Sequence, residues 1–582
     1  MTATSDNDSA ISATRERLRW WREYEFWALL LLVVGVYFTR PTTLSLRGEE
    51  SRWGNIAREM LQSGDFIAPR QQGVVFANRP PLTNWCIALS MTITGKFDAL
   101  TVRLPTLVST LLTTLMLYVL GRRLLSRTGA LVAGSAYATM GQVLQLGRHA
   151  ESEAVLTLFV TASLVGWLAC YRRGAAPWIT WCVGYGFAAL AGLAKGPQGP
   201  VYFFGASWLF CLAFDRAFWR RREHLYGLAC FVAVLCIWQV PLIYTAGFRD
   251  AMRIWFAETT GHIAIAIPLA TRLTHAATFP WEALGCMLPW SVLLFGYGHR
   301  SVRDALGDLR RPAQFLAIAM VIGLLPLLIA VYARGRYYMP LYPCAALLVA
   351  MVVEVCVVRA KERSLHLVWY RYLKGASLVV VGAALFIAAV SILPSWSQHP
   401  FAQSPAVVAG FALAAALTVW ICRREWSRSS NPSAATTHWA ALSLAGFCGI
   451  AYTAVIINSL LARSGDPRHD VQRAIAKLPS EARLVSFSTI HHLFAFYVAD
   501  VDGRTIERAD PVAEADSVSR TWEYFCINST ELPRQLPFRW EQVATVSVDR
   551  NHHEQPKEYV LIGRKLSAGE TIAQEPSGKF VR

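Results

Sequence analysis

Leu46-Arg47-Gly48-Glu49-Glu50-Ser51-Arg52-Trp53-Gly54-Asn55-Ile56-Ala57-Arg58-Glu59-Met60 follows directly after the first strongly apolar segment of the chain. Two adjacent carboxylates, Glu49 and Glu50, open this stretch, and the apolar residues after them recur at the spacing of an amphipathic helix. Carboxylates at the mouth of a membrane span favour a general base or a cation ligand at the boundary between water and lipid. The alternative is a solvated helix start, because Glu in a first turn suits the helix dipole.

The composition is that of a membrane protein. Of the 582 residues, 54% are hydrophobic and only 16% are charged, whereas soluble domains carry roughly 25% charged residues. The formal charge of +17 comes from short Arg and Lys clusters between apolar segments, so it indicates membrane topology and no nucleic-acid partner. The 12 Cys lie mostly inside apolar segments without a CxxC pair, which predicts small buried hydrophobes. No cleavable secretory signal is expected, because residues 1–13 are polar.

The order of apolar segments predicts a topology. Basic residues before the first apolar run, 24–38, place residues 1–23 in the cytoplasm as a tail. Residues 41–98 then form a long first outer loop, in which residues 81–94 are a helix too short to span and therefore interfacial. Further runs lie at 101–120, 128–146, 151–170, 177–194, 198–214, 225–246, 279–297, 312–332, 338–358, 373–393, 403–421 and 437–461, which gives about thirteen spans. Every loop that this order places inside is basic, as the positive-inside rule requires.

An odd number of spans places the C-terminus outside, and the composition becomes that of a soluble domain from about residue 461. Residues 470–478 suit a short helix, whereas residues 483–487 and 558–562 suit strands. The sequence therefore predicts a polytopic α-helical membrane protein with a transmembrane domain at 24–462 and a small extracytoplasmic α/β domain at 463–582. Its expected place is the inner membrane of the cell, crossed many times, with a periplasmic C-terminus.

The predicted topology gathers scattered polar residues on the outer face. Arginines there oppose the positive-inside bias, and an anion held at the outer leaflet explains them, since Arg offers a bidentate fork and Lys a point charge to phosphate. The candidates for binding a lipid-linked phosphate are Arg58, Arg79, Lys195, Arg334, Arg336 and Tyr337. The candidates for lining the substrate pocket are Trp53, Arg148, Glu153, Glu258, Tyr338 and Tyr342. The competing interpretations are a snorkelling lysine at Lys195 and headgroup contacts at Arg334 and Arg336.

The stretch from Glu49 to Met60 resembles the Asp-Glu-x-Arg-Tyr-Ala-x-x-Ala-Arg-Glu-Met loop of one enzyme family. This family is the bacterial branch of the dolichyl-phosphate-mannose–protein mannosyltransferase-like enzymes, which includes the aminoarabinose transferase that modifies lipid A. Further similar stretches follow in the same order: Asn78 to Trp85, Arg103-Leu104-Pro105, Lys195-Gly196-Pro197, Leu288 to Ser291, and Gly335 to Pro343. The resemblance covers most of residues 24–350.

The resemblance implies a GT-C membrane glycosyltransferase that moves a sugar from a polyprenyl-phosphate donor to an extracytoplasmic acceptor, either a glycolipid such as lipid A or a protein. In the family the first acid of the loop is the catalytic base, which falls on Glu49, with Glu50 as the second candidate. The chain has Glu49 where the family usually has Asp, Arg79 where it usually has Lys, and Glu153 where it usually has Asp. Some members bind a metal through an acid at the Asn78 position, so no metal ligand is assigned, no cofactor is certain, and a divalent cation stays open.

Two other hypotheses remain from the sequence. A transporter or flippase of a polyprenyl-linked substrate would place charges on broken helices at the bilayer midplane, and the spans show none. A relative without catalytic activity is the second, and the departures at Glu49 and Asn78 leave it open.

Overall fold

The computed structural model describes residues 20–76, 79–262, 267–360, 362–396, 398–427, 434–463, 465–509, 522–531, 536, 538–548 and 559–566, with the side chains of 256–262 excepted. It forms two compact units. Unit 1 contains residues 1–41, 78–83 and 105–462, and unit 2 contains residues 42–77, 84–104 and 463–582. The expected domain boundaries stay a prediction. In the structure, the first loop and the C-terminal residues belong to the same unit.

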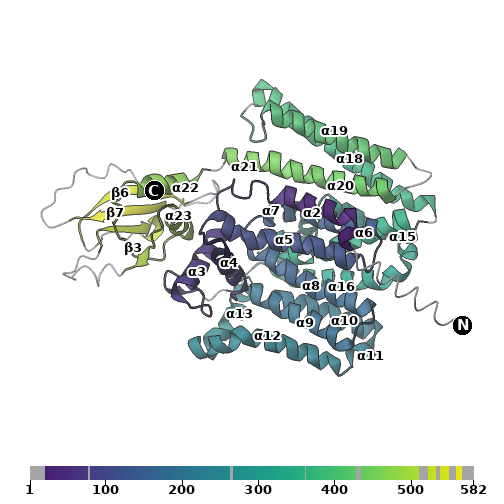
Figure 1. Ribbon diagram of the computed structural model, residues 1–582, viewed down its shortest axis with the longest axis horizontal. Helices are drawn as coiled ribbons and strands as arrows, with labels where there is room; N and C mark the ends of the chain where they lie inside the picture. Colours follow the sequence, from purple (N-terminus) through teal and green to yellow (C-terminus); the bar gives the residue numbers. More distant parts are fainter. Residues whose placement is uncertain are drawn as a thin grey trace. The chain divides into compact units, whose positions relative to one another are not determined.

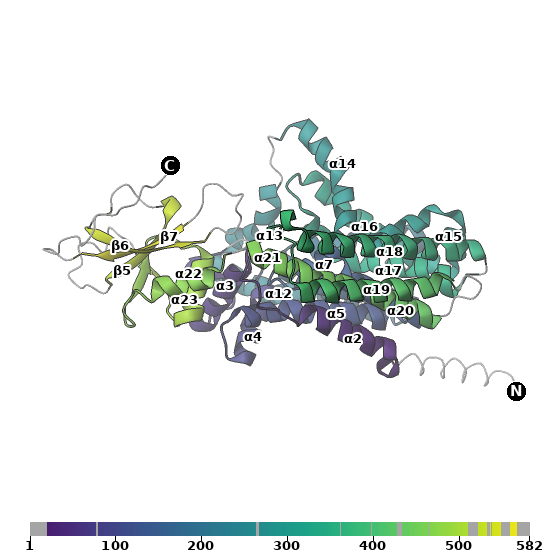
Figure 2. The same ribbon diagram turned by 90° about the horizontal axis from the view of Figure 1, so that it is seen from above.

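Unit 1 is a bundle of helices that lie side by side in both views of the ribbon (Figure 1, Figure 2). Its first half contains η1 (Trp20–Arg22), α2 (Tyr24–Tyr37), α6 (Arg127–Thr139), α7 (Gly141–Leu146), α8 (Ser152–Arg172), α9 (Pro177–Lys195), α10 (Gln198–Phe214), α11 (Arg216–Trp219), α12 (Glu223–Ala246) and α13 (Phe248–His262). Its second half contains α14 (Leu269–Cys286), η2 (Trp290–Gly298), α15 (Arg300–Ala305), η3 (Gly307–Leu309), α16 (Arg310–Ile329), η4 (Gly335–Leu341), α17 (Tyr342–Val353), η5 (Glu354–Val358), α18 (Arg363–Ile392), η6 (Pro394–Trp396), α19 (Pro405–Ser427), α20 (Ala434–Ile450), η7 (Ala451–Ile456) and α21 (Ile457–Arg463). Two helices, α4 (Leu82–Thr94) and α5 (Ala99–Gly121), contribute residues to both units.

In the described part of the chain, nine helical segments are long and apolar enough to cross a membrane. They correspond to nine of the predicted spans. The other four predicted spans are shorter or interrupted in the structure: α2 has 14 residues, α10 has 17, the run 128–146 breaks between α6 and α7, and the run 279–297 divides between α14 and η2. The helical membrane fold is confirmed, and the number of thirteen spans stays a prediction.

Local sequence explains where the helices near the candidate site begin and end. The hydroxyl of Ser126 caps α6 by accepting a hydrogen bond from the Gly129 N–H. Helix α9 begins with Pro177 in its first turn and ends at Lys195, because Gly196 follows with φ of +94°, which a residue with a side chain rarely adopts. The chain then turns directly into α10. Lys195 is thereby fixed at the end of a predicted span.

Unit 2 contains a five-stranded mixed sheet. Its elements are α3 (Glu50–Ser63), β1 (Arg70–Gln71), β2 (Val74–Val75), α22 (Pro467–Ile475), β3 (Leu484–Ser486), α23 (His492–Asp502), β4 (Glu507–Arg508), β5 (Tyr524–Asn528), η8 (Ser529–Glu531), β6 (Trp540–Ser547) and β7 (Tyr559–Lys565). The strand order is β4-β3-β5-β7-β6, with β3 parallel to β4 and β5, and β7 antiparallel to β5 and β6. The small C-terminal α/β region expected from the sequence is confirmed, including its helix at α22 and its strands at β3 and β7.

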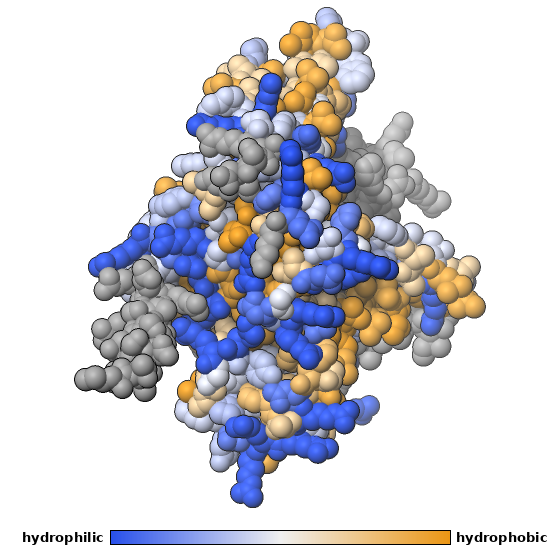
Figure 3. Space-filling model, turned by 90° about the vertical axis from the view of Figure 1, so that its right-hand side faces the viewer, coloured by the Kyte–Doolittle hydropathy of each residue, from blue (hydrophilic) through white to orange (hydrophobic). Residues whose placement is uncertain are grey.

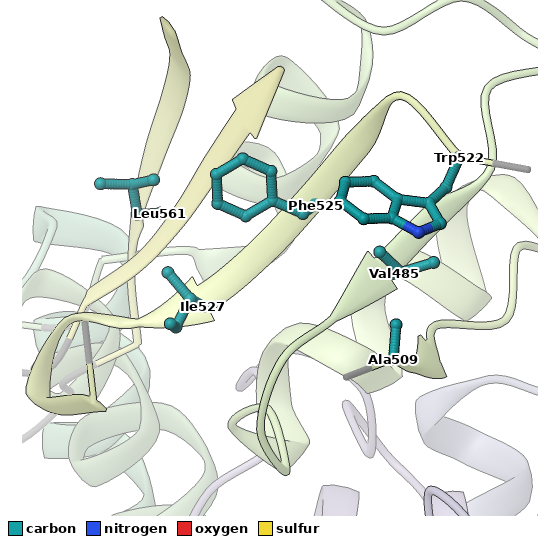
Figure 4. Close-up of a cluster of buried hydrophobic side chains, with 6 residues drawn as sticks. All are labelled: Val485, Ala509, Trp522, Phe525, Ile527 and Leu561. Carbon is teal, nitrogen blue, oxygen red and sulfur yellow. The ribbon is translucent and has the colours of Figure 1, made fainter. Parts of the chain in front are cut away.

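The core of this sheet is aromatic and aliphatic. Figure 4 shows a cluster of buried side chains: Val485, Ala509, Trp522, Phe525, Ile527 and Leu561. Alternation along β5 places Phe525 and Ile527 on the same face, where they meet the side chain of Leu561 from β7. Their burial supplies the hydrophobic free energy that holds the short strands together.

Helix α3 packs against α23 within unit 2. Gly54 allows this contact, because a Cβ at that position would lie 2.9 Å from the ring of Phe496. Two polar contacts fasten the same pair of helices: the Ser51 Oγ lies 2.7 Å from His492 Nδ1, and the Asn55 side chain donates to the His492 carbonyl at 2.7 Å. The N–H of Leu46 also donates to the Tyr497 hydroxyl at 2.9 Å. The loop that carries Glu49 is therefore built onto the C-terminal region.

Candidate active site

A group of charged side chains in unit 1 lies at the ends of three candidate spans. Glu153 lies in the first turn of α8 and Lys195 in the last turn of α9. Arg336 lies in η4, at the start of the candidate span Gly335–Val358. The Lys195 Nζ donates to Glu153 Oε1 at 2.8 Å, and the Arg336 Nε lies 3.8 Å from the same oxygen. The antiparallel course of α8 and α9 explains why residues 42 positions apart meet.

Arg79 and Glu151 also belong to this group. We call the five residues the Lys195 cluster: Arg79, Glu151, Glu153, Lys195 and Arg336. The Glu151 Oε1 lies 3.8 Å from Arg336 Nη1, and the Arg79 Nη1 donates to Ser152 Oγ at 3.2 Å. Arg79 also interacts electrostatically with Glu153. Three cations against two carboxylates leave the cluster with one net positive charge. Such a surplus suits a monoanionic ligand.

The cluster is buried but not closed. The side chains of Glu153 and Lys195 are 1% and 3% exposed, whereas that of Arg336 is 25% exposed. Glu153 Oε2 and Arg336 Nε are buried without a hydrogen-bond partner among the described residues. Buried polar atoms of this kind are normally paired, so Arg336 Nε can donate a further hydrogen bond to a ligand or water, and Glu153 Oε2 can accept one.

The ring of Tyr337 contacts two of the cations. Lys195 Nζ is 4.6 Å from the ring centroid and the Arg336 guanidinium carbon is 5.3 Å from it. The Tyr337 carbonyl accepts a hydrogen bond from the Gln198 side chain at 2.8 Å, which holds η4 against the start of α10. Cation–π attraction of this kind orients both cations without neutralising them.

The two adjacent carboxylates of the first loop have different surroundings within unit 2. Glu50 is fully buried, and its oxygens accept hydrogen bonds from Arg103 Nε at 2.7 Å, from Arg103 Nη2 at 2.8 Å and from the Arg47 N–H at 2.7 Å. Arg103 in turn donates to the carbonyls of Leu44 and Ser45. This arrangement fixes the loop before α3, and it leaves Glu50 unsuited to accept a substrate proton.

Glu49 is the accessible carboxylate of the pair. It is the residue before α3, its side chain is 33% exposed, and it forms an ion pair with Arg52 one turn later. A general base needs a carboxylate that an acceptor can reach. Of the two catalytic candidates from the sequence, Glu49 is the one whose carboxylate is accessible.

The sequence did not separate the roles of these neighbours, because the partner of Glu50 is 53 positions away. Arg103 belongs to the Arg103-Leu104-Pro105 stretch of the resemblance, and its contact with Glu50 gives that stretch a structural role. Glu151 was likewise absent from the predicted site residues. Its position two residues before Glu153 was the available signal.

Several predicted site residues lie elsewhere. Arg58 belongs to unit 2, where it donates to the Gly503 carbonyl and stacks over Phe97; burial lowers the pKa of its guanidinium. Trp53 is buried in the face of α3 and packs against Phe76. Neither contact belongs to the Lys195 cluster.

Four more predicted residues of unit 1 are not among the five residues of the Lys195 cluster. Arg148 is buried and donates to the Val36 carbonyl at the end of α2. Tyr338 donates to the Met320 carbonyl at 2.7 Å, and Tyr342 donates to the Gly335 carbonyl at 3.4 Å. Arg334 is exposed.

Two further positions singled out from the sequence are the predicted pocket residue Glu258 and Asn78, where some family members have a metal-binding acid. The side chain of Glu258 and all of Asn78 lie outside the described residues. Among the residues that the structure describes, no three His, Cys, Asp or Glu side chains are grouped so that they could hold a metal ion.

Comparison with known proteins identifies the family. Residues 78–244 match the family model described as dolichyl-phosphate-mannose-protein mannosyltransferase. An undecaprenyl phosphate-alpha-4-amino-4-deoxy-L-arabinose arabinosyl transferase of Pseudomonas aeruginosa (strain LESB58) is 30% identical over 398 residues, which cover 64% of this chain and 67% of that relative. The chain belongs to this family of GT-C membrane glycosyltransferases. The transferase of the same name from Pseudomonas paraeruginosa is 29% identical over 399 residues, covering 64% of this chain and 67% of that relative.

The fold of this GT-C transferase is similar to that of ArnT from Cupriavidus metallidurans bound to undecaprenyl phosphate. The TM-score is 0.66 at 16% sequence identity, over 93% of this chain and 96% of that one. The resemblance predicted from the ordered motifs is confirmed, and the chain is a multi-pass membrane glycosyltransferase that uses a polyprenyl-phosphate-linked sugar donor. The transporter and scaffold hypotheses are set aside.

Proposed function

We propose that this GT-C transferase moves 4-amino-4-deoxy-L-arabinose from undecaprenyl phosphate to a glycolipid acceptor of the lipid A type on the periplasmic face of the inner membrane. Its relatives are named for this sugar and this carrier. The observation that carries the proposal is the Lys195 cluster, a buried group with one surplus positive charge at the ends of three spans. Four of its five residues lie inside the stretch that matches the family model.

In this proposal the Lys195 cluster holds the donor phosphate. A glycosyl phosphodiester carries one negative charge, which balances the surplus of the cluster. Lys195 supplies a point charge and Arg336 a fork of N–H donors, while Glu151 and Glu153 keep the cations in place before the donor arrives. Preorganised donors of this kind stabilise the charge that develops on a leaving phosphate.

The transfer itself is a single displacement in this proposal. An acceptor oxygen attacks the anomeric carbon, the bond from that carbon to the phosphate oxygen breaks, and the polyprenyl phosphate leaves with the bonding electrons. We assign Glu49 as the base that takes the acceptor proton, because it is accessible whereas Glu50 is locked by Arg103. Glu reaches one methylene further than the Asp usual in the family, so the acceptor oxygen is expected to stand further from the backbone.

The proposal is tested by release of undecaprenyl phosphate from its aminoarabinose conjugate, with purified protein and lipid A in detergent micelles. Wild type is expected to release the carrier and to convert lipid A to a heavier product by mass spectrometry. Glu49→Gln is expected to reduce the rate by about 10²- to 10⁴-fold, the range for loss of a general base. The matched control is Glu481→Gln, which removes the same charge from an exposed position in unit 2.

The outcomes separate the parts of the proposal. A rate for Glu49→Gln equal to that of Glu481→Gln would remove Glu49 as the base and leave the transferase assignment intact. Carrier release with a protein acceptor but not with lipid A would replace the acceptor. Release from another sugar conjugate alone would replace the donor.

A further inference from the structure

The end of unit 1 away from the Lys195 cluster contains a basic cavity of about 490 Å³. Helix α8 runs from Ser152, beside the cluster, to Arg172 at this cavity, a length of about 30 Å at 1.5 Å per residue. The charged residues that line it are Arg122, Arg123, Arg172, Arg173, Arg359 and Asp308. We call this cavity the arginine pocket. Its volume falls in the range of small-ligand sites, roughly 300–1,000 Å³.

Three of these arginines already have carboxylate partners. Arg122 forms a two-point contact with Glu23 at 2.9 Å for each bond. Asp308 is shared by Arg172, at 3.3 Å, and by Arg359. These ion pairs hold the wall of the pocket in place.

The remaining two arginines have surplus charge. Among the described residues, neither Arg123 nor Arg173 forms an ion pair with a carboxylate. The pKa of Arg123 is lowered, first by burial and then by the positive charge of Arg173. Two like charges that face one cavity raise the free energy of the empty site, and an anion between them removes that cost.

The location of the pocket indicates where the anion comes from. It lies at the ends of α5, α8 and η5, which belong to candidate membrane spans, and the neighbouring apolar side chain of Val358 is 44% exposed. Figure 3 faces this end of unit 1, and hydrophilic residues cover much of its middle between hydrophobic flanks. Lipid headgroups lie at this depth, with their acyl chains against exposed apolar side chains.

We propose that the arginine pocket binds the phosphate of an anionic membrane lipid between Arg123 and Arg173. The two guanidinium groups present forks of N–H donors to the phosphate oxygens, and the acyl chains lie along the outer surface of the spans. This lipid is a bound component of the bundle and is not the sugar donor, because the pocket and the Lys195 cluster lie at opposite ends of α8.

Native mass spectrometry of the delipidated full-length protein tests the proposal, with phosphatidylglycerol as probe and phosphatidylcholine as the zwitterionic comparison. Arg123→Gln/Arg173→Gln is expected to weaken the first phosphatidylglycerol binding step by about tenfold or more, since both guanidinium groups lose their charge-assisted hydrogen bonds to the phosphate. Arg220→Gln/Arg221→Gln is the matched control, because it removes two exposed arginines from the loop that joins α11 to α12, outside the pocket. Its affinity is expected to stay within about threefold of wild type, whereas Arg123→Lys/Arg173→Lys, which keeps both charges but loses both forks of N–H donors, is expected to bind with an affinity between those of wild type and the Gln variant.

Equal losses in the two Gln variants would show a general effect of surface charge and overturn the site. Inorganic phosphate at about 10 mM serves as the soluble competitor. Displacement of phosphatidylglycerol by it would assign the pocket to a soluble phosphate compound and overturn the proposal of a lipid ligand. Where the Gln variant does not fold, Asp308→Asn tests the same idea with the opposite sign. It removes the one carboxylate among the described lining residues, so phosphatidylglycerol should bind more tightly, and weaker or unchanged binding would contradict the proposal.

Discussion

The ion pair between Glu50 and Arg103 makes a quantitative prediction for the loop that carries Glu49. Arg103→Met removes the two hydrogen bonds from the Arg103 guanidinium to the Glu50 carboxylate and the positive charge of that guanidinium, while the carboxylate stays fully buried. Removing one partner of a buried pair costs about 3–5 kcal/mol. Exchange of the α3 backbone amides through local opening should therefore accelerate by roughly 10²- to 10⁴-fold.

The assay is hydrogen–deuterium exchange with mass spectrometry on peptides that cover residues 44–63, with wild type and variants in the same detergent. The double variant Glu50→Leu/Arg103→Met replaces both charges by apolar groups and is expected to exchange more slowly than the single variant. It still loses the contacts of Arg103 with the Leu44 and Ser45 carbonyls, so about 1–3 kcal/mol of destabilisation remains.

The surface pair of Glu49 and Arg52 supplies the control. Its side chains are 33% and 27% exposed, and exposed pairs contribute about 0–1 kcal/mol, so Arg52→Met should change exchange by less than about fivefold. The reasoning is refuted by an Arg103→Met variant that exchanges like wild type. A double variant as fast as the single one would show that the buried charge is not the cause.

Three further predictions concern other parts of the chain. Lys195→Met should weaken donor binding by about tenfold or more in titrations of the aminoarabinose conjugate of undecaprenyl phosphate, whereas Lys374→Met, which removes an exposed lysine, should leave it within about twofold. The pKa of Asp65 lies below its ordinary value of 3.8. Burial raises this pKa, but the hydrogen bonds from the N–H groups of Ala68 and Ile67 and the charge of Arg70 lower it by more. Its stabilisation is therefore present above pH 3.8 and lost as the pH falls through the lower folded-state pKa, so the Tm difference between wild type and Asp65→Asn should be full at pH 7 and shrink as the pH falls below 3.8. Gly323→Ala should destabilise by about 1–3 kcal/mol in thermal melts, because the new Cβ would lie 2.0 Å from a Leu341 methyl, whereas Gly35→Ala has nothing within 4 Å and should be neutral.

The sequence predicted the gathering of Arg79, Glu153, Lys195 and Arg336 because alternating spans determine which loops share a face of the membrane. That inference needs only the length of apolar runs and the position of basic loops. Lys195 and Glu153 end and begin neighbouring antiparallel spans, so their contact follows from the topology. The helical fold and the C-terminal strands at β3 and β7 were predictable for the same reason, since their hydrophobic patterns are local.

The sequence could not divide adjacent residues by role. Glu49 and Glu50 differ because a helix about fifty residues later places Arg103 beside only one of them. Arg148 was predicted to line the substrate pocket because of its position in an outer turn, and its guanidinium donates to the Val36 carbonyl near the end of α2. Such choices depend on side-chain packing between distant segments, which no local pattern records.

The charge balance of the Lys195 cluster has a consequence for turnover. Its single surplus positive charge matches the donor, a phosphodiester with one negative charge. The released carrier is a phosphate monoester whose second pKa is about 6, so it approaches two negative charges at neutral pH. If the Lys195 cluster holds the phosphate as proposed, its positive charge attracts the doubly charged product more strongly than the singly charged donor, so release of the spent carrier is expected to be a slow step of turnover.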